Sequence, residues 1–87
     1  MSSAERRKSP RRMVNQPVLM MGDGGTMIAP CTMVDVSAGG ARLKLDAEVP
    51  VPNEFNLMLS KFNASLMRRC LIAWRDERQM GVRFLNA

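Results

Sequence analysis

A dense group of polar residues lies at positions 35–40, Asp-Val-Ser-Ala-Gly-Gly, between two apolar stretches of the chain. The carboxylate of Asp35 can accept hydrogen bonds from the N1 and N2 edge of a guanine, and the Ser37 hydroxyl can donate one to a phosphate. Gly40 carries no side chain, so a ligand can come close to the backbone there. The alternative is a plain turn, in which Asp35 and Ser37 bond nearby amides and the glycines supply a positive φ. The segment alone fits a turn and a binding site equally well.

The second polar group is the basic run near the start of the chain, Glu-Arg-Arg-Lys-Ser-Pro-Arg-Arg over residues 5–12. Five basic residues and one acidic residue give residues 1–12 a net charge of +4, whereas the whole chain carries +5. Arginine side chains bind phosphates, or the O6 and N7 edge of guanine, through paired hydrogen bonds. A solubilising tail is the alternative. We predict that residues 1–12 form a flexible basic arm whose charge meets an anionic partner.

The segments that follow the polar group are predicted to be strands. Apolar and polar residues alternate over 41–46, 55–60 and 79–84, which is the period of a half-buried strand. Over 64–74 the apolar residues also fit a helix. We favour a strand there, because this segment runs through a charged turn into 79–84 and the two together have the pattern of a hairpin.

A second hairpin is predicted nearer the start of the chain. A glycine-rich turn at 22–25 joins the apolar run 18–21 to a partner strand over 27–36. Five or six short strands separated by turns predict an all-β fold, either a small antiparallel barrel or a sandwich. Residues 13–87 are therefore expected to form one domain.

Little in the chain supports catalysis. It has no histidine, no cluster of metal ligands and no phosphate-binding loop motif, and Ser37 has no candidate base near it in the sequence. We expect neither an enzyme nor a metal or cofactor site. Cys31 and Cys70 are expected to be reduced core residues. No apolar run has the length of a membrane span, and no export leader follows the charged start, so we expect a cytoplasmic protein.

Two short motifs, taken in order, resemble those of the PilZ domain family. An Arg-x-x-x-Arg motif, formed by Arg7 and Arg11, precedes the first predicted strand. An Asp-x-Ser-x-x-Gly motif, formed by Asp35, Ser37 and Gly40, lies between the second and third strands. The stretches 73–75, Ala-Trp-Arg, and 81–84, Gly-Val-Arg-Phe, resemble the closing hairpin of that family.

The resemblance implies a six-stranded antiparallel β-barrel that binds the bacterial second messenger cyclic di-GMP. The ligand-binding residues it implies are Arg7, Arg11, Asp35, Ser37 and Gly40. Arg6 precedes the first motif and could reach a second guanine. We therefore assign Arg6 to the site as well, with the hypothesis that a stacked pair of ligand molecules binds.

Three side chains outside the motifs could also act on a ligand, one by stacking and two through their charge. Trp74 can stack on a base, although a buried or half-buried place in the barrel is favoured. Arg42 and Arg83 are expected on the solvated faces of their strands, where their charge would add to the field of the site.

The function implied by the resemblance is that of a ligand sensor. Ordering of the basic arm over the ligand would create a surface for an unidentified effector protein, and the family suggests regulation of motility or exopolysaccharide. One alternative is an interaction module with the same fold and no ligand. A small basic nucleic-acid-binding barrel is disfavoured, because the body is nearly neutral and has no tyrosine, three phenylalanines and one tryptophan.

Overall fold

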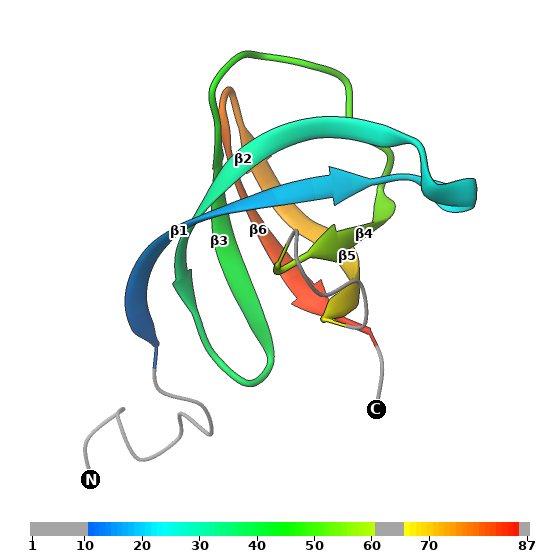
Figure 1. The fold of residues 1–87 in the computed structure, drawn as a ribbon. Helices are drawn as coiled ribbons and strands as arrows, with labels where there is room; N and C mark the ends of the chain where they lie inside the picture. The colour runs from blue at the N-terminus through cyan, green and yellow to red at the C-terminus, as the bar shows by residue number, and fades with distance from the viewer. Residues whose placement is uncertain (1–10, 61–65, 86–87) are drawn as a thin grey trace, which may run out of the picture.

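Six antiparallel strands close into a single barrel in the order β1-β2-β3-β6-β5-β4 (Figure 1). The structure is a computed structural model that describes residues 11–60 and 66–85. It contains β1 (Arg12–Met21), η2 (Asp23–Gly25), β2 (Met27–Val36), β3 (Gly40–Leu45), β4 (Glu54–Met58), β5 (Met67–Asp76) and β6 (Gln79–Phe84). The predicted six-stranded antiparallel barrel is confirmed, and the sandwich is excluded.

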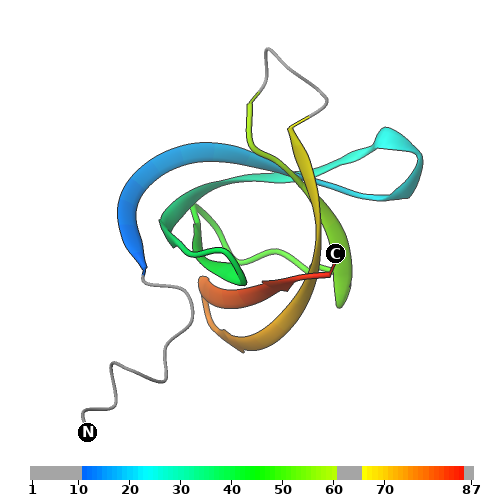
Figure 2. The ribbon, with the colours of Figure 1, turned by 90° about the horizontal axis from the view of Figure 1, so that it is seen from below.

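Alternation of apolar and polar residues builds the core. Along β3 the residues Ala41, Leu43 and Leu45 are buried, while their neighbours face outward. Phe55 and Leu57 do the same on β4. Because a strand turns successive side chains to opposite faces, this pattern fills the barrel from every strand. The core side chains come from all six strands, and Figure 2 shows these strands curving around a common centre.

A helix was the alternative for the segment 64–74. Most of its described part lies in strand β5, as favoured. β5 pairs with β4 on one side and with β6 on the other, and the β5–β6 hairpin turns at Glu77 and Arg78, between the paired residues Asp76 and Gln79. Within the described residues, no helix has the length and apolarity needed to cross a bilayer.

The first strand is longer than its apolar run suggests. β1 begins at Arg12, the last residue of the predicted arm, and its first half is exposed. A register shift between Met13 and Gln16 in the pairing with β2 accommodates Asn15, whose φ is 45°. Backbone pairing rather than burial therefore defines the start of β1, and alternation cannot reveal it. Residues 1–10 lie outside the described residues, so the flexibility of the arm stays a prediction.

An ion-pair cluster links β5 to η2, in the turn of the β1–β2 hairpin, and to β4. The Arg69 guanidinium on β5 lies 2.8 Å from an Asp23 carboxylate oxygen in η2 and 2.9 Å from a Glu54 carboxylate oxygen on β4. The hydrogen bonds to both carboxylates raise the pKa of Arg69 above its ordinary value. These groups are exposed enough for water to weaken their attraction, so the cluster contributes little to stability.

The two cysteines are unpaired thiols inside the barrel, as expected. Burial raises the pKa of Cys31 from 9.0 to about 12, with smaller contributions from Asp46 and Cys70. Burial likewise raises the pKa of Cys70 to about 12, against the lowering effect of Arg68 and Arg69. Thiols held protonated in this way are poor nucleophiles, which fits a packing role.

We expect alkaline pH to destabilise the fold through these thiols. Below pH 9.0 both thiols are protonated whether the chain is folded or not. Between 9.0 and about 12 the unfolded chain releases protons that the folded chain retains, so the free energy of unfolding falls as pH rises. Urea denaturation at pH 8 to 11 should show a shallower decline for Cys31→Val than for the native chain. Equal declines would contradict this assignment.

Candidate functional site

Asp35 is a buried carboxylate held between two arginines. It lies near the end of β2, and its side chain is 3% exposed. The Arg11 guanidinium donates through Nη1 to Oδ1 at 3.0 Å, and the Arg42 guanidinium donates through Nη2 to Oδ2 at 2.7 Å. An unpaired charge in such a place would be costly, so the two cations compensate for its burial.

The strand register explains why Arg42 faces Asp35. The register of β2 and β3 shifts between Met33 and Asp35. Met33 pairs with Leu43, whereas Asp35, two residues further along β2, pairs with Arg42, the immediate neighbour of Leu43 on β3. Two residues of β2 thus oppose one step of β3, and such a bulge re-aims the side chain that follows it. Arg42 was expected on a solvated face, and its side chain is 39% exposed, but the alternation pattern contains no sign of the bulge that brings it to Asp35.

The link from β2 to β3 combines turn chemistry with an unusually close strand approach. The Ser37 amide donates to the Gly40 carbonyl at 2.8 Å, and the Ser37 hydroxyl contacts the same oxygen at 3.4 Å. The Phe84 amide of β6 donates to the Gly39 carbonyl at 2.9 Å. Ser37 therefore has the local role of a turn residue, while its hydroxyl also lies at the rim of a cavity.

Gly40 is required by packing and not by backbone conformation. Among the described glycines, positive φ values occur at Gly24 and Gly25, so the positive φ considered for the 35–40 segment was wrong. A Cβ atom on Gly40 would overlap the carbonyl oxygen of Val82 on β6. Absence of a side chain lets β3 and β6 pair at this point and leaves their outer surface open.

A cavity of about 250 Å³ lies over this part of the barrel. It opens onto the 37–41 link on one side and onto β5 and β6 on the other. It is lined by Arg11, Ser37, Gly39, Gly40, Ala41, Ala73, Trp74, Gly81, Val82 and Arg83. Asp35 does not line the cavity but holds Arg11, which does. Two arginines and no carboxylate line it, so the cavity suits an anion.

Trp74 forms part of the cavity wall. A register shift between Ile72 and Trp74 leaves Ala73 as an extra residue on β5. Trp74 then lies opposite Gly81, so close that a Cβ atom there would overlap the indole Nε1. The structure leaves Trp74 45% exposed, whereas the sequence favoured a buried or half-buried place. An exposed indole beside two arginines can stack on a planar base.

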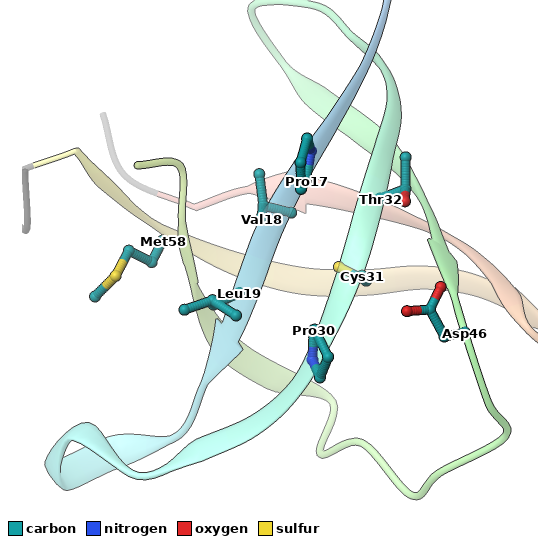
Figure 3. A pocket seen from close by; sticks show the side chains of 8 residues that line it. All are labelled: Pro17, Val18, Leu19, Pro30, Cys31, Thr32, Asp46 and Met58. Carbon is teal, nitrogen blue, oxygen red and sulfur yellow. The ribbon is translucent and has the colours of Figure 1, made fainter. Parts of the chain in front are cut away.

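A second cavity, of about 190 Å³, has the opposite character (Figure 3). It lies on the β1–β2 hairpin, and its lining residues are mostly apolar. They are Pro17, Val18, Leu19, Pro30, Cys31, Thr32, Asp46 and Met58. Asp46 is the charged group of this lining, and its carboxylate would repel a phosphate. We therefore expect an anionic ligand to bind in the cavity beside Arg11 and not in this second cavity.

The site residues predicted from the sequence divide into two sets. The structure brings together Arg11, Asp35, Ser37 and Gly40. Arg6 and Arg7 lie outside the described residues, so their roles and the stacked pair of ligands stay predictions. Arg42 was missed as a partner of Asp35. Its only signal in the sequence is its position two residues after Gly40.

The glycines offer a test of how tightly the cavity is built. In Gly40→Ala the new methyl group meets backbone that cannot move without disturbing the β3–β6 pairing, so unfolding should become easier by about 1–3 kcal/mol. In Gly81→Ala the methyl group meets the Trp74 side chain, which can swing away. That variant should change the fluorescence of the single tryptophan more than it changes stability.

Gly39→Ala is the matched control. No atom lies within 4 Å of a Cβ at this position, so its stability in urea should stay close to that of the native chain. Equal stabilities of Gly40→Ala and Gly39→Ala would show that the close approach of β3 and β6 is not rigid.

Comparison with known proteins agrees with this architecture. The family model described as the PilZ domain matches residues 5–87, which is nearly the whole chain. A search of curated proteins found no significant match. The matched range includes both motifs and all six strands of the barrel, and the chain therefore belongs to the PilZ domain family.

Proposed function

We propose that this chain is a cytoplasmic sensor of cyclic di-GMP that acts by binding and not by catalysis. The PilZ domain implies a cyclic di-GMP-binding module. The observation that carries the proposal is the cavity in which Arg11 from the first motif meets Ser37 and Gly40 from the second. Arginines line that cavity and carboxylates do not, as a doubly anionic ligand requires.

Each motif residue has a role that follows from its position. Arg11 directs its guanidinium toward a phosphate or the O6 and N7 edge of a guanine. Ser37 donates to a phosphate, and Gly40 leaves room for the ligand to approach the backbone. Asp35 lies behind the cavity lining and is 3% exposed, so its role in this proposal is to hold Arg11 at the cavity, and a guanine N1 or N2 could bond it only by displacing an arginine.

The cavity walls supply two further contacts. The exposed indole of Trp74 offers a stacking surface for one guanine, and Arg83 on β6 places a second cation at the rim. We expect Arg6 and Arg7 of the basic arm to add further positive charge to the site. If these arginines all contact ligand, we expect two ligand molecules per chain, bound as a stacked pair.

The output we propose is ordering of the basic arm over the bound ligand. An ordered arm presents a new surface to an effector protein, and the domain itself needs no metal, cofactor or catalytic residue. Regulation of motility or exopolysaccharide is the pathway that the family suggests.

Calorimetric titration with cyclic di-GMP tests the proposal. We expect binding at micromolar ligand with two ligand molecules per chain, and a shift in Trp74 fluorescence on saturation. Each of Arg7→Ala and Arg11→Ala should weaken binding by roughly 5- to 150-fold, the equivalent of about 1–3 kcal/mol for a bidentate contact. Arg69→Ala, which removes an arginine at the far end of the barrel, should bind as the native chain does.

The contrary outcomes separate the alternatives. Absence of heat from the native chain would favour an interaction module without ligand. Unchanged affinity in the arginine variants would refute the site. Binding of unrelated oligonucleotides with a steep dependence on salt would instead favour a nucleic-acid-binding barrel. A stoichiometry of one would overturn the stacked pair alone.

A further inference from the structure

Arg42 belongs to neither motif and does not line the cavity, yet it is bonded to the centre of the site. Its Nη2 donates to Asp35 Oδ2 at 2.7 Å, while Arg11 occupies the other oxygen of the same carboxylate at 3.0 Å. Arg11 precedes β1 and Arg42 lies on β3, and both bond Asp35. The bonded route from Arg42 to a ligand in the cavity therefore runs through Asp35 and Arg11.

Arg11 needs such support because most of its side chain is in water. Its side chain is 60% exposed, and ion pairs at such positions ordinarily contribute little, since a long side chain samples many rotamers. The partner here is different, because the Asp35 side chain is 3% exposed and fixed in the barrel wall. The direction of its carboxylate decides where Arg11 points, and Arg42 fixes that direction by holding the second oxygen.

Arg42 is poorly arranged for stability alone. Its Nε is buried and has no hydrogen-bond partner within residues 11–60 and 66–85. A buried donor without a partner carries a desolvation cost, which offsets the gain from the bond to Asp35. Removal of Arg42 would abolish both, and Asp35 would retain Arg11. Arg11 would then compensate for the Asp35 charge alone, so a variant without Arg42 should lose some stability but remain folded.

We propose that Arg42 is a positioning residue for the ligand site, which acts by orienting Asp35 so that Asp35 holds Arg11 at the cavity. This inference rests on the proposed binding of cyclic di-GMP in the cavity. It assigns a function to a residue that the two motifs omit, and it explains why an arginine occupies the β3 position opposite Asp35.

A double-mutant cycle on cyclic di-GMP affinity tests the proposal. Arg42→Met should weaken binding about tenfold, a typical coupling between residues in one ion-pair network. In the Arg11→Met background the same substitution should cause no further loss, because its effect travels through Arg11. Arg42→Lys should restore part of the affinity, since an ammonium group can still bond one carboxylate oxygen.

Two measurements guard against a merely structural effect. Urea denaturation should show that Arg42→Met loses some stability and still folds cooperatively, because Arg11 continues to compensate for the Asp35 charge. Arg69→Met, which removes an ion-paired arginine whose side chain is 32% exposed, against 39% for Arg42, should leave ligand affinity unchanged. Additive losses in the cycle would overturn the proposal in favour of a direct contact between Arg42 and ligand, and so would an undiminished affinity in Arg42→Met.

A readout without ligand keeps this inference separate from the proposed function. The Nε–Hε resonance of Arg11 in the NMR spectrum of the ligand-free chain should shift in Arg42→Met and not in Arg69→Met. If the native chain binds no cyclic di-GMP, the proposed function fails, while this resonance still decides whether Arg42 orients Arg11. An unshifted resonance would overturn the coupling itself.

Discussion

The burial of one carboxylate organises this end of the barrel. Asp35 has almost no contact with water, and a charge in that position is tolerated only if cations reach it from the neighbouring strands. Arg11, just before β1, and Arg42, on β3, meet that requirement from the two sides of β2. The constraint fixes where β1 can begin, how β2 and β3 align, and which face of the barrel is positively charged.

Two glycines shape the surface beside that charge. Gly40 lets β3 approach β6, and Gly81 lets the Trp74 indole lie against the β6 backbone. Neither position has a positive φ, so both are glycines because of what lies next to them. The result is a hollow with arginines at its rim, a stacking surface on one wall and exposed backbone below. The apolar cavity on the β1–β2 hairpin has none of these properties.

The sequence predicted the elements well because a strand with one buried face has a period that can be recognised locally. The segments 27–36 and 79–84 agree with β2 and β6, and the closed barrel followed from the family resemblance. What alternation could not reveal is register. The bulges before Asp35 and Trp74 decide which side chains face each other, and they depend on pairing between distant strands. The ion pair of Arg42 and the exposure of Trp74 therefore became visible only in three dimensions.

The anchoring of Arg11 also sets how strongly the rest of the first motif can act. Arg7 lies four residues before a side chain bonded to the barrel wall, and four residues of chain span at most about 14 Å. Arg7 is thus covalently tethered within that distance of Arg11, which lines the cavity. Its effective concentration there is of millimolar order, as for a short linker between two binding groups. Under the proposed function, arginine contacts that are weak in isolation would therefore suffice to hold a ligand.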